Sequence, residues 1–207
     1  MTVRDTNPYP WPYDGVLEPA RTALVVCGLQ QCWADLDPRV TAELLALIPA
    51  ARAAGLHIVF VQHARLRPTG RPGADLPLAG DAAAELLLTA AVDDVVVTAS
   101  THDGFLDTPL DATLRARGID HLLFVGLAAE VVVDSTLRSA NDRGYECLTV
   151  IDATAPFDAH TGARTLDSIT KSGGIFGAIG TSAAVADAYG LAPMHPGAGS
   201  PVKESLR

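Results

Sequence analysis

The sequence is short of lysine, cysteine and long apolar runs, and each shortage excludes a class of protein. Lysine occurs only twice, at Lys171 and Lys203, and the net charge is −9. Because nucleic acids and anionic membranes bind to basic faces, neither is an expected partner. No apolar run approaches the roughly 20 consecutive residues of a membrane-spanning helix. The three cysteines, Cys27, Cys32 and Cys147, are an odd number without metal-ligand spacing. We therefore expect reduced thiols, no metal site and a cytoplasmic location.

Targeting and nucleotide-binding motifs are also missing. Residues 1–15 are polar and proline-rich and lack the basic and apolar regions of a signal peptide, so none is expected. Neither a G-x-G-x-x-G fingerprint nor a P-loop is present, and we expect no cofactor. The chain has 207 residues, of which 48% are hydrophobic, which is enough for one domain with a sizeable core.

Apolar runs of strand length alternate along the chain with segments of helical periodicity. We expect one domain over 1–207, with an amino-terminal arm at 1–20 and a flexible tail at 192–207. Residues 64–81 are rich in Pro, Gly and Arg and predict a long loop, and 82–92 favours a short helix. The expected strands cover 22–28, 57–62, 93–99, 121–126, 146–152 and part of 175–180, and the expected helices cover 39–55, 108–118, 130–144, 160–174 and 181–190.

This alternation predicts an α/β protein with a three-layer α/β/α, Rossmann-like architecture. About six mainly parallel strands would lie between two layers of helices. In such sheets the functional site lies at the carboxyl ends of the strands, where the strand order reverses. The residues at those ends are Gly28, Ala99 and the turn after Gly126. We expect the strands that end at Gly28 and Gly126 to be adjacent at the centre of the sheet.

Several motifs together resemble one family. They include "NPYPWPYDG" near the amino terminus, "ARTALVV" in the first strand, "LRARGI", "STLRSANDRGYECL" and "GGIFGA". Over roughly residues 7–190 the chain resembles the isochorismatase-like cysteine hydrolases, and most of all their biuret and ureidoacrylate amidohydrolases. The resemblance implies an oligomeric three-layer protein with an Asp-Lys-Cys triad. In that triad the cysteine attacks a carbonyl carbon, the aspartate takes its proton, and the lysine lowers the thiol pKa.

The triad positions carry other residues here. The family's aspartate follows the first strand in a pattern like V-I-D-M-Q, where this chain has Gly28. The family's lysine lies six residues before a phenylalanine. Here the phenylalanine is Phe105, and the lysine position is occupied by Ala99. The family's cysteine lies in a pattern like G-x-x-T-x-V-C-V, where this chain has Val132. A thiolate and its base are therefore not expected at these positions.

Other residues near the expected site are candidates for replacement roles. Cys32 is a candidate nucleophile, and His102, Glu130 and Asp134 are candidates for acid–base chemistry. Each also has a structural interpretation: acids in a first helical turn complement the helix dipole, and a loop histidine is simply solvated. The expected ligand-binding residues are Gln30, Trp33, His63, Phe105, Ala128 and Ala129, with the last two supplying backbone amides at the turn.

Three functions remain open on this basis. The first is a pseudo-hydrolase that keeps a small-molecule pocket or acts as a partner subunit. The second is a repurposed lyase, isomerase or cyclase that uses acid–base chemistry. The third is a non-standard hydrolase that uses Cys32 or an activated water. The expected partners are a small molecule and other subunits, in a homo-oligomer or a hetero-oligomer with an intact paralogue.

Overall fold

The computed structural model describes residues 2–67 and 76–191, so the expected tail at 192–207 lies outside the described residues. Six parallel strands form one sheet in the order β3-β2-β1-β4-β5-β6. The strands are β1 (Thr22–Cys27), β2 (His57–His63), β3 (Val95–Ala99), β4 (His121–Leu127), β5 (Glu146–Ala155) and β6 (Ala178–Gly180). The predicted fold class is confirmed, including the adjacent central strands β1 and β4.

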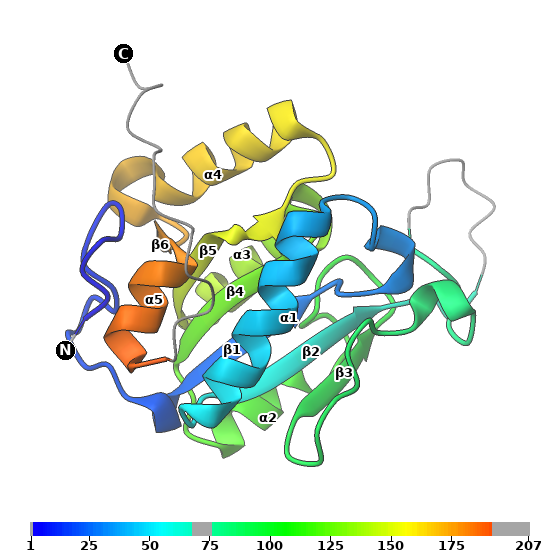
Figure 1. The fold of residues 1–207 in the computed structure, drawn as a ribbon, viewed down its shortest axis with the longest axis horizontal. Helices are drawn as coiled ribbons and strands as arrows, with labels where there is room; N and C mark the ends of the chain where they lie inside the picture. Colours follow the sequence, from blue (N-terminus) through cyan, green and yellow to red (C-terminus); the bar gives the residue numbers. More distant parts are fainter. Residues whose placement is uncertain (1, 68–75, 192–207) are drawn as a thin grey trace.

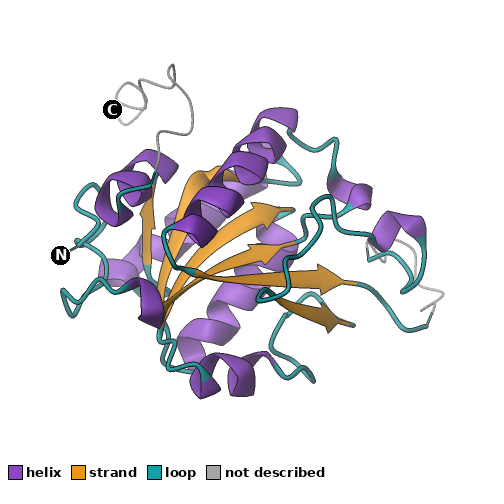
Figure 2. Ribbon diagram, turned by 60° about the horizontal axis from the view of Figure 1, so that its bottom comes forward, coloured by secondary structure: helices purple, strands orange, loops and turns teal. Residues whose placement is uncertain are grey.

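Helices cover both faces of this sheet. Figure 1 shows α1 and α5 in front of the strands and α2 and α3 behind them, and Figure 2 shows the same layers from a second direction. β1 and β4 are buried at every position, which explains their continuous apolar sequences. The helices are α1 (Pro38–Ala53), α2 (Leu110–Ala116), α3 (Asp134–Asp142), α4 (Ala159–Gly174) and α5 (Ser182–Tyr189).

Three expected helices differ in the structure. The expected helix over 82–92 is only a single 3₁₀ turn, Ala82–Ala84, because the next residues bond to the loop after β1: Leu87 N–H donates to Leu29 O at 2.9 Å. The helix expected from residue 130 begins as a π-helical turn, Ala129–Val133, which leads into α3. The helix expected over 160–174 loses its regular geometry at Lys171, where the backbone becomes extended.

Candidate functional site

The three positions that the family motifs point to lie at the carboxyl end of the sheet, each at or just after the end of a strand. Gly28 follows β1, and its amide donates to the carbonyl of Val61 in β2 at 3.1 Å. Ala99 ends β3 and pairs in register with His63 of β2. Val132 lies in the π-helical turn that follows β4, the other neighbour of β1. Gly28, Ala99 and Val132 are all buried, so this edge is part of the apolar core.

Gly28 and Trp33 fit together in a way that leaves no room for a side chain at position 28. Gly28 has φ +64°, a left-handed conformation that favours glycine. A Cβ atom there would lie 2.8 Å from Cζ3 and 2.9 Å from Cε3 of the Trp33 indole. Trp33 is only 3% exposed and follows directly in a 3₁₀ turn, Gln31–Trp33. The indole therefore fills the space that a side chain at position 28 would enter.

Gln30 is fully buried and its amide group is used within the protein. Its Oε1 accepts the backbone amide of His63 at 2.7 Å, and its Nε2 donates to the carbonyls of His63 at 3.0 Å and Ala84 at 2.9 Å. These bonds join the loop after β1 to the end of β2. The expected ligand-binding side chain thus supports the loop that carries Trp33.

His63 lies behind Trp33 rather than at an open pocket mouth. It is 0% exposed, and the two ring centroids are 6.4 Å apart. Its Nδ1 lies 2.9 Å from the carbonyl oxygen of Thr101, which can only accept, so Nδ1 carries the proton. Its Nε2 is buried without a hydrogen-bond partner among the described residues. Burial lowers the His63 pKa to about 4, so the ring is neutral at pH 7.

None of the three thiols is activated. Cys27, whose side chain is fully buried, has its pKa raised to about 12 by burial. Cys32 is exposed, and partial desolvation raises its pKa to about 11. Burial also raises the pKa of Cys147 well above its usual value. A nucleophilic cysteine needs the opposite shift, because only the thiolate attacks.

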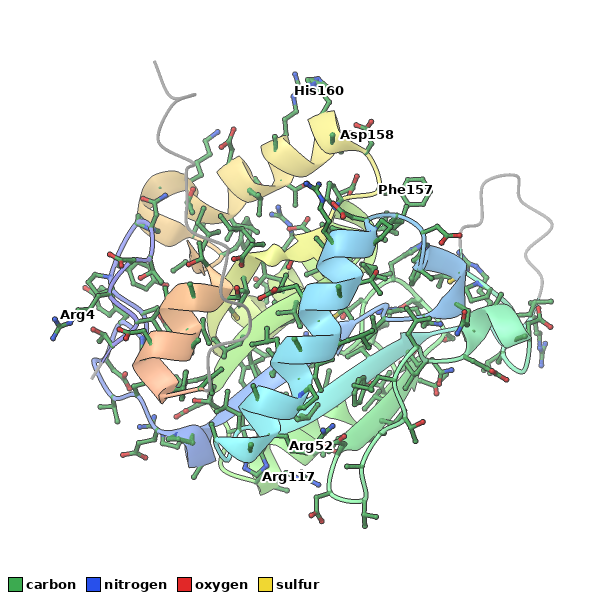
Figure 3. All side chains as sticks on the ribbon, viewed as in Figure 1. Arg4, Arg52, Arg117, Phe157, Asp158 and His160 are labelled. Carbon is green, nitrogen blue, oxygen red and sulfur yellow. The ribbon has the colours of Figure 1, made fainter. Side chains whose placement is uncertain are left out.

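The acid–base candidates are engaged in structural contacts. Glu130 accepts the backbone amides of Phe157 at 2.8 Å and Asp158 at 2.7 Å. These two residues directly precede α4, as Figure 3 shows, so the contacts fix the start of that helix. Asp134 accepts from Arg138 Nε at 2.8 Å, one helical turn away. His102 is half-buried in the loop after β3.

The remaining expected ligand-binding residues are core residues. Phe105 is 4% exposed and packs against Tyr145, with the guanidinium of Arg143 5.0 Å from its ring centroid. Ala128 is fully buried with φ +57°, and its carbonyl accepts the amides of Val131 and Val132 at 3.0 Å. Ala129 is 7% exposed. The amides of Val131 and Val132 are thus bonded within the turn rather than directed at a ligand.

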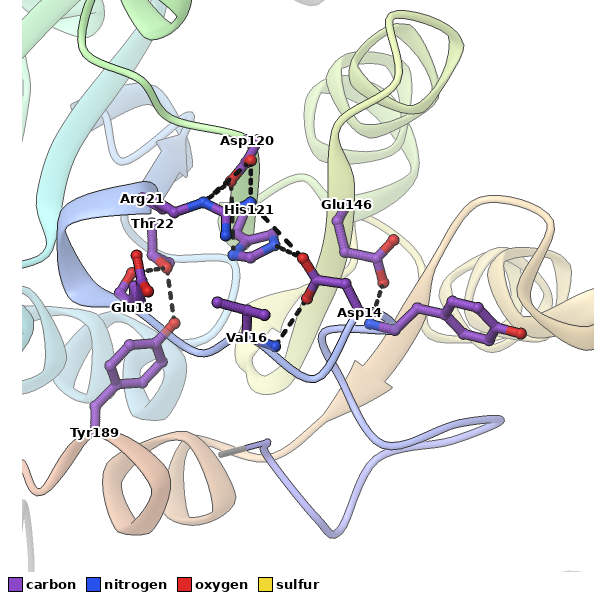
Figure 4. Close-up of polar contacts among 10 residues, drawn as sticks. Asp14, Val16, Glu18, Arg21, Thr22, Asp120, His121, Glu146 and Tyr189 are labelled. Carbon is purple, nitrogen blue, oxygen red and sulfur yellow. Dashed lines mark hydrogen bonds and ion pairs between the residues drawn. The ribbon is translucent and has the colours of Figure 1, made fainter.

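A cavity at the opposite end of the sheet was not foreseen from the sequence. It has a volume of about 230 Å³ and lies at the amino ends of β1, β4 and β5 (Figure 4). The one available signal was the presence of the polar residues His121 and Glu146 at the starts of apolar strands. Its lining is Tyr13, Asp14, Arg21, Asp120, His121, Gly144 and Glu146.

Across the described ranges, 2–67 and 76–191, no three or more His, Cys, Asp or Glu side chains are placed to hold a metal ion. Within the same ranges, no helix combines the length and the apolar character needed to cross a membrane.

Comparison with known proteins agrees with this fold. The isochorismatase domain model matches residues 22–181. Ureidoacrylate amidohydrolase RutB of Methylobacterium radiotolerans is 32% identical over 176 residues, covering 67% of this chain and 68% of the relative. A cysteine hydrolase from Pseudomonas syringae pv. phaseolicola superposes with a TM-score of 0.76 at 26% identity, covering 84% of this chain and 94% of the other. An isochorismatase family protein from Burkholderia thailandensis superposes with a TM-score of 0.72 at 29% identity, covering 85% of this chain and 98% of the other.

The fold and these comparisons define the class, a three-layer α/β protein related to cysteine hydrolases. The chain belongs to the isochorismatase family.

Proposed function

We propose that this chain is a pseudo-hydrolase of the isochorismatase family, which does not catalyse cysteine-dependent hydrolysis and acts as a partner subunit of an intact paralogue. The observation that carries the proposal is the packing of Trp33 against Gly28. A side chain at position 28 and the indole of Trp33 cannot occupy the same space, which supports the absence of a catalytic base at this position.

The chemistry of the neighbouring positions supports this. Covalent hydrolysis requires a thiolate and a base to lower its barrier. Val132 and Ala99 supply neither, and both side chains are 0% exposed. All three thiols have raised pKa values, so each is protonated at neutral pH.

The same packing favours a partner role over a small-molecule pocket retained at this edge. Gln30 and His63 are fully buried, and Trp33 is 3% exposed, so a ligand would reach none of them without movement of the indole. A subunit that contributes only its surface to an assembly needs no open pocket. If this chain retains the subunit interfaces of the family's oligomers, those interfaces are sufficient for a partner role.

The two other functions receive less support. A repurposed acid–base enzyme would need free proton-transfer groups, whereas Glu130 and Asp134 are bound to backbone amides and Arg138. A hydrolase based on Cys32 would need a lowered thiol pKa, and that pKa is raised to about 11.

The catalytic half of the proposal is tested by assay. Purified protein is incubated with ureidoacrylate, biuret, nicotinamide and maleamate, with a ureidoacrylate amidohydrolase as the positive control. We expect no turnover above the uncatalysed rate. Turnover that iodoacetamide and Cys32→Ser both abolish would overturn the proposal and establish the hydrolase based on Cys32.

The partner half is tested by co-expression. The chain is produced together with an intact isochorismatase-family protein from the same genome, and the mass of the purified complex is measured by light scattering. We expect a defined hetero-oligomer. Two separate species at micromolar concentration, from every intact paralogue in that genome, would contradict the partner role.

A further inference from the structure

The two edges of the sheet are protected differently. The strand order makes β3 and β6 the edge strands, and Figure 1 shows them at opposite sides of the sheet. At β6 the amino-terminal arm supplies the missing neighbour: Asn7 N–H donates to the carbonyl of Ile179 at 2.9 Å, and Ile179 N–H donates to the carbonyl of Asn7 at 2.8 Å. No segment within residues 2–67 and 76–191 pairs with the outer side of β3 in this way.

The outward backbone groups of β3 belong to Val96 and Thr98. The carbonyl of Ala99 accepts the amide of Ala64, which directly follows β2, at 2.9 Å, so Ala99 directs its backbone groups toward β2. Because successive residues of a strand direct their N–H and C=O groups to alternate sides, those of Val96 and Thr98 are directed away from the sheet. In the part of the chain that the structure describes, these outward groups have no hydrogen-bond partner.

The features that usually protect an exposed edge are missing from β3. Residues 95–101 contain no charged residue and no proline, and the register with β2 runs without a bulge from Val95 to Ala99. Val96 is 45% exposed, and Thr98, on the same face of the strand, is also exposed. An uncharged edge strand with unpaired backbone groups is a template for pairing with another strand.

The strand is complementary to a second copy of itself. A two-fold axis through Val97 places β3 antiparallel to its copy, with Val96 opposite Thr98 of the second copy. Since both residues have outward backbone groups, each of the two symmetric pairs exchanges both of its N–H···O=C bonds. The Val96 and Thr98 side chains of both copies then form one row of β-branched residues on a single face, which is a favourable cross-strand combination.

The charges near the two ends of β3 also suit an antiparallel arrangement. Arg117 lies at the start of β3, where its Nη1 donates to the carbonyl of Asp93 at 3.4 Å, and it forms no ion pair with a described residue. Asp107, in the loop between β3 and α2, is exposed, and its carboxylate likewise has no partner within the described ranges. Antiparallel pairing brings Arg117 of one copy toward Asp107 of the other. Asp93 is exposed at the same end as Arg117 and offsets part of this attraction, so the charges select the orientation and the strands supply most of the binding.

We propose that β3 pairs edge to edge with β3 of a second copy of this chain, which forms a homodimer with one continuous sheet. Figure 2 shows β3 as the outermost strand, away from the arm. The interface consists of one strand edge and a few side chains, so association is weak, with an expected Kd of about 10–100 μM. The inference goes beyond the proposed function, because Gly28 and Trp33 take no part in this surface.

The test is sedimentation velocity on the purified full chain between about 1 and 300 μM, a range that spans the expected Kd. We expect the sedimentation coefficient to rise from the monomer value to the dimer value. Thr98→Pro removes an outward N–H but no bond to β2, and it should weaken association at least tenfold. Thr98→Val keeps the backbone and the β-branched shape, and this matched control should leave the Kd within twofold of the natural chain.

A second variant guards against a folding defect caused by the proline. Val96→Lys keeps the backbone and places a charge on the exposed face of the edge, and it should also weaken association at least tenfold. A natural chain that stays monomeric to about 300 μM would overturn the proposal, because pairing of the edges would then be weaker than a millimolar Kd allows. A dimer that Thr98→Pro and Val96→Lys leave intact would place the interface elsewhere and would also overturn it.

The orientation of the two copies is tested by charge. Arg117→Glu places an acid near Asp107 of the second copy and should weaken association at least threefold, and adding Asp107→Asn to the same chain should recover this loss. Arg164→Glu, on the exposed surface of α4, makes the same change in net charge and is the control. Equal effects of Arg117→Glu and Arg164→Glu would overturn the antiparallel pairing. No paralogue is present in these measurements, so their outcome is separate from that of the partner role.

Discussion

The two ends of the sheet contain matching pairs of buried aromatic residues that have different surroundings. At the carboxyl end Trp33 lies 6.4 Å from His63, and at the amino end Trp11 lies 5.5 Å from His121. Both histidines are almost fully buried, and each has one ring nitrogen without a hydrogen-bond partner among the described residues. The tryptophan in each pair covers the end of a central strand.

The difference lies in what surrounds each histidine. His63 pairs with Ala99 and lies near His102 and Asp103 of the loop after β3, and burial lowers its pKa to about 4. His121 lies within 3.7 Å of the carboxylates of Asp14 and Asp120, beside a polar cavity. The carboxyl end around Gly28 and Trp33 is therefore packed as core, whereas a polar cavity lies at the amino end.

The largest expected loss of stability comes from disrupting the packing at the carboxyl end of the sheet. Trp33→Ala removes a buried indole, and we expect it to cost about 3–5 kcal/mol of unfolding free energy. Gly28→Ala combines left-handed strain with a clash against Trp33 and should cost about 2–5 kcal/mol. Because the clash disappears in the double variant, its loss should fall short of the sum by more than about 1 kcal/mol. Urea unfolding of all four proteins measures this.

A second glycine distinguishes the cost of backbone strain from the cost of the clash with Trp33. Gly118 has φ +68°, close to that of Gly28, but a Cβ atom there would meet nothing within 4 Å. Gly118→Ala should therefore show only the strain contribution of about 1–2 kcal/mol. Equal losses in Gly118→Ala and Gly28→Ala would mean that Trp33 does not occupy the space beside position 28.

The second effect concerns the pH dependence of His63. Between about pH 6.5 and 4 the ring is protonated in the unfolded chain but neutral in the folded protein, so acid favours unfolding. Stability is complete above pH 6.5 and falls by about 3 kcal/mol as the pH approaches 4. His63→Gln should remove this part of the pH dependence, measured by urea unfolding between pH 7 and 4.5. His160→Gln, at the exposed start of α4 (Figure 3), should leave it unchanged.

The fold was predictable because it depends on local patterns. The alternation of apolar runs and helical periodicity predicted all six strands. The central runs are buried on both faces of the parallel sheet, and the edge strand β3 is apolar though partly exposed. The expected helix at 82–92 failed because its backbone bonds to the loop around Leu29, a tertiary contact that no local pattern contains.

The site was harder to predict because its groups meet only through the fold. Gly28 was visible in the sequence, but its left-handed backbone and its contact with Trp33 depend on how the loop turns after β1. Gln30 matched an expected ligand-binding residue, yet its amide is satisfied by His63 and Ala84. The amino-edge cavity brings together residues more than 100 positions apart, so no motif marks it.

A third prediction concerns the only exposed thiol. The raised pKa of Cys32 keeps it protonated at pH 7, so we expect iodoacetamide to modify it about ten- to a hundredfold more slowly than a free cysteine. The rate of alkylation should still rise steeply above pH 9, whereas that of a free cysteine levels off once the pH passes its pKa of about 8.5. Cys32→Ser should leave no thiol that reacts in the folded protein, since Cys27 and Cys147 are buried. A rate that levels below pH 8 would indicate an activated cysteine and weaken the contrast between the two ends.

The smallest expected effect tests whether the charges at the amino end serve stability. Arg21 and Asp120 are about one-third and nearly half exposed, and exposed ion pairs contribute about 0–1 kcal/mol. Asp120→Ala should therefore cost less than about 1 kcal/mol, and less still in 1 M salt. Asp94→Ala is the matched comparison, because the Asp94 side chain is 3% exposed and accepts from both Arg52 and the amide of Ala91. It should cost about 1–3 kcal/mol, since the buried Asp94 carboxylate accepts two bonds from the Arg52 guanidinium and one from the Ala91 amide, and all three are lost. If Asp120→Ala proved as costly as Asp94→Ala, the charged cluster would be a structural element, and the amino end would resemble the closed carboxyl end. A small loss would show that Arg21 and Asp120 form an ordinary exposed ion pair, so that the two ends of the sheet differ in how much their polar contacts stabilise the fold.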